Sequence, residues 1–302
     1  MTLFGYAMEP SAFVGVVTLG ALCVLVLYEW ASGKYGGGRK TANDWKMFAL
    51  SGLGVGLVER PALAALVAGI AALVVPQWAG AFHHVEQTHF WACLVAFLLM
   101  DEFLHGLGHY FAHQPPPANW WAAKVHAFMR EAHRAHHQLG DDERAELSVT
   151  QSVVAGWGWL FLLPNYWFGL VMLYLGFVEC FVVVALIKTL WGMHVHTNWQ
   201  YDLYLLNHGN RFVRGAMRAA AHVLTFPNQH HQHHSRSPNS AKNLQNVLAL
   251  FDWLVWGTLV IETERPAIYG WRQQPRERNV FHRYFARPLK TPRKRLVPDA
   301  GA

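Results

Sequence analysis

Histidines recur in this sequence at spacings that place them on one face of a helix, as a metal site requires. The first set falls on every fourth residue, at His105, His109 and His113. A second pattern, H-x-x-H-H, occurs twice, and its copies are His133, His136, His137 and His230, His233, His234. Residues three and four apart share a helix face, so members of one set can bind one ion together. Imidazole is a ligand of zinc, copper, iron and nickel, and the motifs therefore predict metal binding.

The number of histidines indicates two metal ions. Fifteen of the 19 histidines lie between His105 and His234, and two of them, His194 and His196, directly follow an apolar segment. A tetrahedral zinc site takes four ligands, or three and a water, which is fewer than the motifs offer. Carboxylate-bridged di-iron bundles use Glu-x-x-His pairs, and neither copy of H-x-x-H-H contains one. We therefore expect a pair of metals bound mainly by nitrogen.

The composition predicts that these motifs belong to an all-α, polytopic membrane protein. Hydrophobic residues make up 53% of the 302 residues and charged residues only 15%, where a soluble protein has about a quarter charged. The mean hydropathy is +0.11. The three cysteines, Cys23, Cys93 and Cys180, all lie in apolar runs, which excludes a disulfide scaffold. The sequence has no phosphate-binding loop and no nucleic-acid module, so we expect no nucleic-acid partner.

Apolar segments of about 20 residues are long enough to cross a bilayer, and they predict four to five spans. The first is expected from Phe13 to Tyr28, and the second from Pro61 to Trp78. A third begins with the apolar run from Phe90 to Met100 and continues into the first histidine motif.

Two further apolar stretches are less regular. The stretch from Met47 to Val58 is short and is followed by Glu59, Arg60 and Pro61, so we expect an interfacial segment or a broken half-helix. The stretch from Val153 to about Ile187 is long enough for two helices joined by a very short turn.

Basic residues predict the orientation of these spans. The segment after the first span holds Lys34, Arg39, Lys40 and Lys46, whereas residues 79–89 hold no Lys or Arg. The segment from Arg265 onward has ten Lys and Arg against two acidic residues. Because basic loops stay in the cytoplasm, we expect the N-terminus outside, and the C-terminus and the metal site inside, in a plasma or inner membrane. We divide the chain into an integral membrane domain, residues 1–264, and a basic cytoplasmic tail, residues 265–302.

The order of the motifs resembles that of the fatty acid hydroxylase superfamily, the sterol-desaturase-like integral membrane oxygenases. The likeness covers residues 102–258, about half of the chain, and consists of H-x-x-x-H, H-x-x-H-H, H-x-N and P-x-x-H-x-x-H-H-S. It continues into N-x-x-N-V-L-x-L-F-D-W-L-x-W-G-T, with Asn243, Asp252, Gly257 and Thr258. Pro227 stands three residues before the last histidine triplet, as in that family.

The resemblance implies a set of metal ligands in this chain. They are His109, His113, His133, His136, His137, His196, His230, His233 and His234, and further candidates are His105, His194 and Asn198. His109 and His113 fit the first motif best, because Glu102 then stands where the family has an acidic residue. His105 competes with them for that place. Asp101, Glu102, Glu131 and Asp252 are candidates to accept the ring N–H groups of the ligands, or else to form salt bridges.

The resemblance also implies a function, that of a membrane-bound non-haem di-iron oxygenase. Such an enzyme would hydroxylate or desaturate a C–H bond of a lipid from the bilayer, with oxygen and two external electrons. The sequence has no iron–sulfur, haem-attachment or flavin motif, so the electrons must come from a separate ferredoxin or small haem protein with its reductase.

Two other classes of protein remain open at this point. A histidine-rich metal transporter would carry its ligands at mid-membrane on several spans, and it would exchange its metal readily. A zinc-dependent membrane hydrolase would act without oxygen or a reductant.

Overall fold

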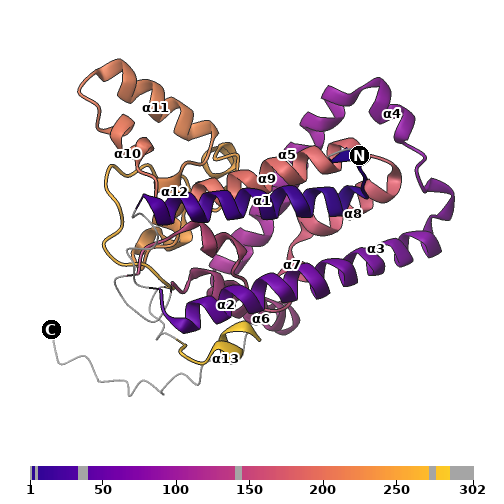
Figure 1. Cartoon of the computed structure of the whole chain (residues 1–302), viewed down its shortest axis with the longest axis horizontal. Coiled ribbons are helices and arrows are strands. Elements are labelled where there is room, and N and C mark those ends of the chain that lie inside the picture. The colour runs from indigo at the N-terminus through magenta and orange to yellow at the C-terminus, as the bar shows by residue number, and fades with distance from the viewer. Residues whose placement is uncertain (1, 4–5, 33–39, 140–144, 272–276, 286–302) are drawn as a thin grey trace.

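The computed structural model is an all-α bundle that contains four helices long and apolar enough to cross a membrane (Figure 1). It describes residues 2–3, 6–32, 40–139, 145–271 and 277–285. The four candidate spans are Ala12–Ala31, Ala42–Val74, Phe90–His113 and Val178–His196. The predicted class, a polytopic helical membrane protein with histidines grouped at one end, is therefore confirmed.

The elements follow one another along the chain in a simple order. The first half contains β1 (Thr2–Leu3), β2 (Tyr6–Ala7), α1 (Pro10–Ala31), α2 (Ala42–Leu53), a π-helical segment (Gly54–Glu59), α3 (Arg60–Val74), a 3-10 turn (Pro76–Trp78), α4 (His83–Thr88), α5 (Phe90–His113) and α6 (Trp120–His137). The second half contains a 3-10 turn (Val149–Val153), α7 (Trp159–Leu162), α8 (Pro164–Leu175), α9 (Val178–His196), α10 (Tyr201–Leu206), α11 (Arg211–Val223), α12 (Pro227–His233), a 3-10 turn (Pro238–Ala241), a π-helical segment (Asp252–Trp256) and α13 (Val280–Tyr284).

The second span differs from its prediction, because the chain does not break at Glu59–Pro61. Helices α2 and α3 continue into one another through the π-helical segment and form a single candidate span of 33 residues. Proline has no N–H and crowds the carbonyl four residues earlier, and the wider π turn gives it room. The buried carboxylate of Glu59 accepts the backbone N–H of Gly158 at 3.1 Å, so it does not interrupt the helix either.

The predicted pair of helices between Val153 and Ile187 forms, but only one of them is long enough to span. Gly176 and Phe177 alone separate α8 from α9, and Gly176 has a φ of 108°, which side-chain-bearing residues rarely adopt. Helix α8 has 12 residues and is about 18 Å long, short of the roughly 30 Å that a bilayer core requires. Helix α9 instead extends to His196 and carries that histidine into the site.

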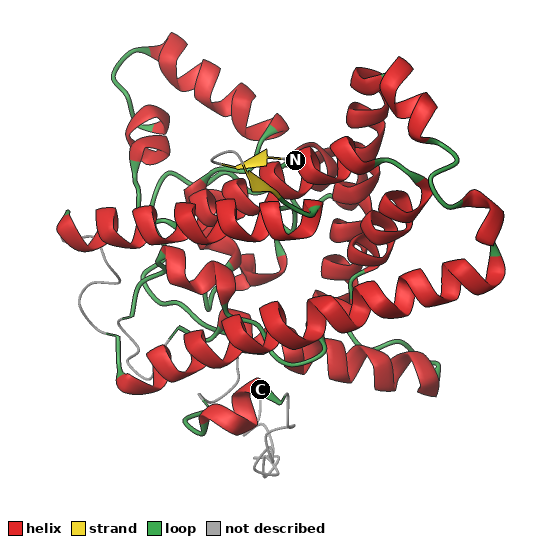
Figure 2. Ribbon diagram, turned by 45° about the vertical axis from the view of Figure 1, so that its right-hand side comes forward, coloured by secondary structure: helices red, strands yellow, loops and turns green. Residues whose placement is uncertain are grey.

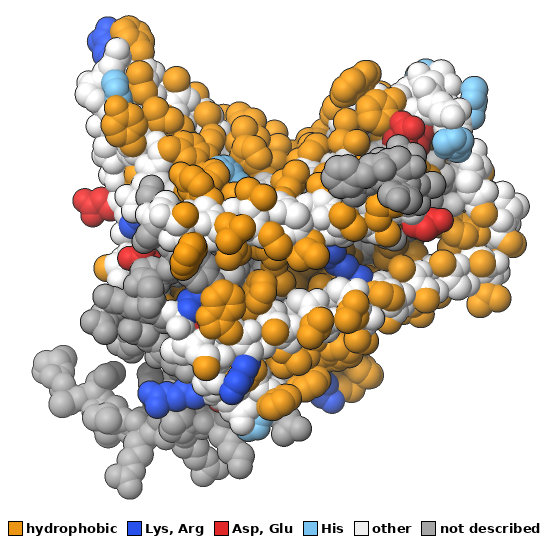
Figure 3. Space-filling model, viewed as in Figure 1, with side chains coloured by type: hydrophobic (Ala, Val, Ile, Leu, Met, Phe, Trp, Pro, Cys, Tyr) orange, Lys and Arg blue, Asp and Glu red, His pale blue; other side chains and the backbone are white. Residues whose placement is uncertain are grey.

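Helices make up most of the fold, and the two short strands lie beside the N-terminus (Figure 2). Side chains from α5, α8 and α9 form the core of the membrane-spanning part. Leu94 and Phe97 of α5 pack against Cys180 and Val184 of α9, and Phe168 of α8 stacks edge-on to Phe97 with ring centroids 5.1 Å apart. On the outside of the bundle, large apolar side chains of the spans are exposed, including Leu19, Leu27, Leu57, Leu73 and Trp91. Hydrophobic side chains accordingly cover much of the face seen in Figure 3, as expected of a surface that contacts lipid.

Part of the segment predicted to be a basic tail packs against the histidine end of the bundle. Tyr269 and Trp271 are buried, and the Gly270 N–H donates to the carbonyl of His234 at 2.9 Å. Arg283 and Tyr284 of α13 are also buried, and the Arg283 guanidinium donates to the carbonyl of Ala135 at 3.1 Å. These residues are part of the core rather than of a solvated extension.

Candidate metal centre

Four helices bring the histidines of the motifs together at one end of the bundle. Helix α5 ends at His113 and α9 ends at His196, so both carry a histidine at the end of a span. Helix α6 supplies the first H-x-x-H-H copy at its C-terminal end, and α12 supplies the second. Residues far apart in the sequence thus meet because two candidate spans and the helices α6 and α12 end at the same place.

The histidines form two groups that could each hold a metal ion. Within each group, one nitrogen from every member lies within 4.8 Å of the others. The first group is His109, His113, His133, His137 and His233, and the second is His136, His196, His230 and His234. The structure thus brings together all nine histidines named as ligands from the resemblance. That these nine bind metal remains a prediction.

The two groups lie side by side. The rings of His137 in the first group and His234 in the second stack with centroids 4.5 Å apart. His133 and His136, one from each group, stack at 5.5 Å. The H-x-x-H-H spacing explains this, because each copy divides its three histidines between the two groups. The arrangement is that of a dinuclear site.

The hydrogen bonds of His136 and His196 show that their facing nitrogens carry no proton. Nδ1 of His136 contacts the carbonyl of Val154 at 2.8 Å, and Nδ1 of His196 contacts the carbonyl of Gly192 at 2.5 Å. A carbonyl only accepts, so Nδ1 is the protonated nitrogen in each neutral ring. The two Nε2 atoms are nevertheless 3.2 Å apart. Two bare lone pairs at that distance repel one another unless a cation lies between them.

The same argument applies to His133 in the first group. Its Nε2 lies 2.8 Å from Nε2 of His109, 3.0 Å from that of His113 and 2.9 Å from that of His137. Nδ1 of His109 is committed to the carbonyl of Leu244 at 2.5 Å. Nε2 of His133 would therefore have to carry a proton and donate it to Nε2 of His109. It would then have no lone pair with which to accept a hydrogen bond from His113 or His137. One ion bound by all these nitrogens accounts for the geometry, since ligand nitrogens about 2 Å from a metal lie close to one another.

His233 also has a nitrogen prepared for a metal. Its Nδ1 donates to the carbonyl of Lys242 at 2.9 Å, and its buried Nε2 has no hydrogen-bond partner among the described residues. Metal-binding histidines ordinarily hold their second nitrogen in this way. Four other ligands lack such a contact within the described part of the chain, because Nδ1 is buried without a partner in His133, His137, His230 and His234.

Burial keeps the histidines outside the spans neutral. Desolvation lowers the pKa of His136 from 6.5 to about 4. Burial likewise lowers the pKa of His133, His137, His230, His233 and His234 well below 6.5, and the neighbouring rings add to the effect. Neutral imidazole is the form that binds a metal, so these six rings are in their binding form at neutral pH.

Two carboxylates act on the ligands through the backbone rather than by contacting the rings. Asp252 accepts the N–H of Leu244 at 2.8 Å and that of Gln245 at 3.0 Å. Glu102 accepts the N–H of Val247 at 2.8 Å and pairs with Lys188 at 3.0 Å. They fix the segment whose Leu244 carbonyl orients His109.

The other two carboxylates form ion pairs. Asp101 pairs with Lys188, and Glu131 pairs with Arg134 at 2.7 Å. Among the described residues, the recorded acceptors of the ligand N–H groups are thus carbonyls. The salt-bridge alternative describes these carboxylates better than direct contact with a ligand ring.

The three further candidate ligands lie outside both groups. His105 is half-buried one helical turn from His109, with ring centroids 5.4 Å apart. Nε2 of His194 contacts the hydroxyl of Tyr201 at 2.7 Å. The amide of Asn198 donates to Glu146 at 2.6 Å. His231 is also outside both groups, and its two nitrogens contact the Tyr269 hydroxyl and the Thr197 carbonyl.

Two tryptophans, Trp159 and Trp271, cover the first histidine group. Trp159 stacks on His133 with centroids 4.4 Å apart, and Trp271 packs against His137 at 4.8 Å and His113 at 5.0 Å. Both are buried, so they exclude water from this side. The sequence does not predict the role of Trp271, because no pattern distinguishes it within a basic segment.

Glu29 was also missed as a residue that positions the site. Its carboxylate is buried at the end of α1 and accepts the N–H of Asn198 at 3.0 Å and that of Val149 at 3.1 Å. Asn198 follows the ligand His196 by two residues, so Glu29 ties the first span to the end of α9. A buried acid in an otherwise apolar span was the signal that could have identified it.

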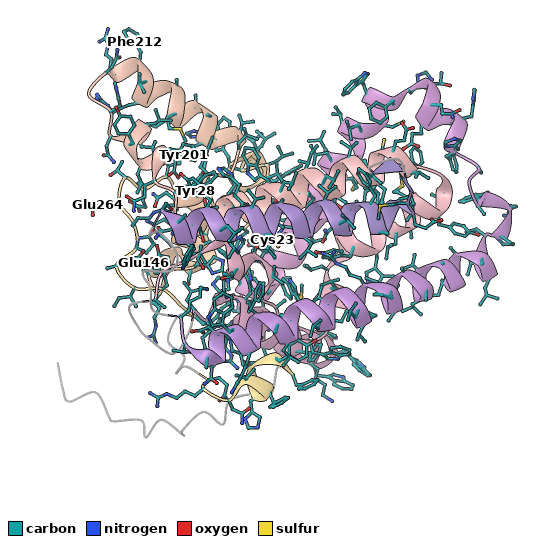
Figure 4. All side chains as sticks on the ribbon, viewed as in Figure 1. Cys23, Tyr28, Glu146, Tyr201, Phe212 and Glu264 are labelled. Carbon is teal, nitrogen blue, oxygen red and sulfur yellow. The ribbon has the colours of Figure 1, made fainter. Side chains whose placement is uncertain are left out.

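An apolar groove opens beside the end of α1. It has a volume of about 530 Å³ and is lined by Val24, Leu25, Tyr28, Trp199, Gln200 and Tyr201. Figure 4 shows Tyr28 and Tyr201 close together at this end of the bundle, and Trp199 stands edge-on to Tyr28 with centroids 5.6 Å apart. Trp199 of the groove wall follows His196 by three residues, which places an apolar hollow next to an element of the site.

Comparisons of the chain with family models, curated proteins and solved structures gave no match. The resemblance to the fatty acid hydroxylase superfamily therefore remains an expectation from the histidine motifs.

Proposed function

We propose that this protein is a membrane-bound non-haem di-iron oxygenase that hydroxylates or desaturates a lipid. The observation that carries the proposal is the pair of adjoining imidazole groups, one of five and one of four histidines, at the end of apolar spans. A group of five nitrogens exceeds the four ligands that tetrahedral zinc takes, and it suits an ion that accepts five or six. The motif resemblance to the fatty acid hydroxylase superfamily supports the same assignment.

The residues of the chain would bind, orient and shield the ions. The facing Nε2 atoms are the ligands, and the carbonyls of Val154, Gly192, Leu244 and Lys242 hold the rings in the required tautomer. Two iron ions bound there would supply oxygen activation and attack on an unactivated C–H bond. Trp159 and Trp271 would keep water from the first group.

The substrate and the electrons come from outside the chain. The lipid-facing groove between Tyr28 and Tyr201 is a candidate for holding a hydrocarbon chain near the interface. Hydroxylation consumes one oxygen molecule and two electrons with two protons, and releases water with the alcohol. Because the sequence has no redox cofactor motif, a ferredoxin or a small haem protein would deliver those electrons.

The test is metal analysis followed by an activity measurement on the full-length protein purified in detergent. We expect about two irons per chain, and oxygen consumption that requires both a reductant and lipid. His233→Ala is the inactive control. Zinc together with oxygen-independent hydrolysis would instead identify a hydrolase, and metal that exchanges rapidly would identify a transporter. Mass spectrometry of lipid extracts from cells with and without the gene would then identify the product.

A further inference from the structure

Helix α11 has three distinct faces, only one of which packs against the protein. Met217 and Ala221 form the packed face and are buried. Phe212, Ala216, Ala219 and Val223 are exposed and recur at a spacing of three to four residues, so they form one apolar face. We call these four residues the apolar stripe. Phe212 is 72% exposed, which is unfavourable for a phenyl ring in water.

The third face of α11 is basic. Arg211 and Arg218 are exposed on it, and α11 contains no acidic residue. Arg214 has a structural role, because its guanidinium donates to the carbonyl of His208 at 2.7 Å and to that of Gly209 at 3.0 Å. On a helical projection the basic face borders the apolar stripe directly. A helix with an apolar face beside a basic one is typical of a helix that lies in a membrane interface.

The position of α11 in the fold also agrees with a helix that lies in a membrane interface. It belongs to the end of the molecule where α1, α5 and α9 finish, and it projects sideways from the bundle (Figure 1). Figure 4 shows Tyr28, Tyr201 and Phe212 at this same end. Tyr201 and Tyr204 are exposed there together with Trp30 of α1, and exposed Tyr and Trp residues mark the headgroup level of a bilayer.

From these observations we propose that α11 is an interfacial helix that binds anionic phospholipids. The apolar stripe enters the boundary between headgroups and acyl chains, and Arg211 and Arg218 pair with lipid phosphates. The occupant is a lipid because the stripe belongs to the end of the molecule where candidate spans finish, and because a basic face lies beside it. This inference does not depend on the proposed oxygenase activity.

The helix also connects the membrane surface to the metal centre. The side chain of Gln229 in α12 donates to the carbonyl of Ala221 at 2.8 Å, and the Thr225 N–H donates to the carbonyl of Val247 at 2.9 Å. Only residues 224–226 separate α11 from α12, which carries His230, His233 and His234. A lipid-anchored α11 therefore fixes the height of α12, and of its three ligands, relative to the bilayer surface.

The position of the stripe can be tested by fluorescence quenching on the full-length protein in nanodiscs. The protein carries Cys23→Ala and either Ala216→Cys on the apolar stripe or Gly215→Cys on the basic face, with an environment-sensitive dye on the new cysteine. A protein without either new cysteine measures labelling of Cys93 and Cys180. We expect a spin-labelled acyl chain to quench the dye at position 216 strongly, and aqueous iodide to quench it at position 215. Equal iodide quenching at both positions would overturn the proposal, as would protection of position 216 from both quenchers, which would indicate a second protein copy.

Lipid selectivity is tested separately by the phospholipid that co-purifies. The full-length protein is placed in nanodiscs of phosphatidylcholine with or without phosphatidylglycerol. Replacing Arg211 and Arg218 together by Gln is expected to lower retained phosphatidylglycerol on the order of tenfold, and high salt should have a similar effect. Lys124→Gln on α6, an exposed cation elsewhere, is the matched control. Unchanged retention in the double variant, or equal loss in the control, would contradict anionic lipid binding by α11.

Discussion

Nε2 of His136 and Nε2 of His196 face one another at 3.2 Å, although the second nitrogen of each ring is held by a backbone carbonyl. Neither facing nitrogen can donate a hydrogen bond, so the contact is unfavourable without a cation. His136 lies on α6 and His196 at the end of α9. The pair therefore joins the end of a candidate span to the end of α6, in a group of histidines that could hold a metal ion.

The two histidine groups predict two ions that can be lost separately. His113→Ala or His233→Ala should reduce the metal content from about two ions per chain towards one, because each removes a ligand from the first group only. His230→Ala should do the same through the second group. Metal content is measured by mass spectrometry of the purified protein. His282→Ala, an exposed residue of α13, is the control, and unchanged content in all three test variants would refute metal binding at these groups.

The tautomer assignment predicts which amide can replace a ligand. The amide of glutamine reaches roughly the position of Nε2, whereas that of asparagine reaches only that of Nδ1. Since Nε2 is the facing atom in His136 and in His196, replacement by Gln should retain more metal than replacement by Asn at each position. Chelator competition at neutral pH measures the difference. Equal or reversed retention would mean that the other nitrogen binds.

Asp252 should affect the metal without contacting it. Asp252→Ala leaves the N–H groups of Leu244 and Gln245 without their acceptor, and it frees the segment that orients His109. Lost hydrogen bonds to a buried carboxylate cost about 3 kcal/mol of unfolding free energy, and loss of such indirect support lowers metal affinity by about 10- to 100-fold. Thermal unfolding and chelator competition measure the two effects. Asp252→Asn keeps one acceptor oxygen and should fall between wild type and Ala.

The topology predicted from the basic residues can be tested by cysteine labelling from each side of the membrane. Gln138 and Ser235 directly follow two of the histidine motifs, but both are buried and unsuitable for labelling. Pro116 and Gly209 are exposed near the histidine end, and Ala81 is exposed near the opposite end of the spans. In a Cys23→Ala background, cysteines at 116 and 209 should be labelled from the cytoplasm and a cysteine at 81 from outside. Labelling of 116 and 209 from opposite sides would exclude a single site.

The basic C-terminal segment should divide into a structural and a docking part. Arg272, Arg276, Arg278 and Arg283 of this segment are candidates to guide an acidic electron donor, with lipid headgroups as the competing partner. Arg283 is buried against Ala135, so Arg283→Ala should lower the melting temperature. Arg272 and Arg276 lie outside the described residues.

Arg278 is exposed, so it remains a candidate for docking an electron donor. If it guides a donor, Arg278→Gln should slow reduction of the purified protein at low salt, and the defect should shrink as ionic strength rises. Metal content should be unchanged. A wild-type rate of reduction in stopped-flow measurements at low salt would leave only the lipid role for this residue.

Much of the architecture follows from the sequence alone, because its patterns are local. Uninterrupted apolar runs predict the helices that begin at Pro10 and Phe90, since a bilayer requires backbone hydrogen bonds to be made within each segment. The break expected at Glu59–Pro61 was wrong, because the features that keep the helix continuous there do not follow from the local sequence. A π turn accommodates the proline, and Gly158, 99 residues away, satisfies the glutamate.

The metal site, like the fold, was predictable from the sequence only in part. The types and spacing of the histidines predicted that the motifs could bind metal, since repeats of three and four place side chains on one helix face. The resemblance implied which nine of them would meet, and the structure brings these nine together. The sequence did not determine how the H-x-x-H-H copies divide between two groups, which nitrogen faces inward, or that Trp271 and Glu29 support the site. Those features depend on where α5, α6, α9 and α12 end relative to one another. Only the packing of the spans decides that, because backbone carbonyls and apolar surfaces from distant segments must fit around the same rings.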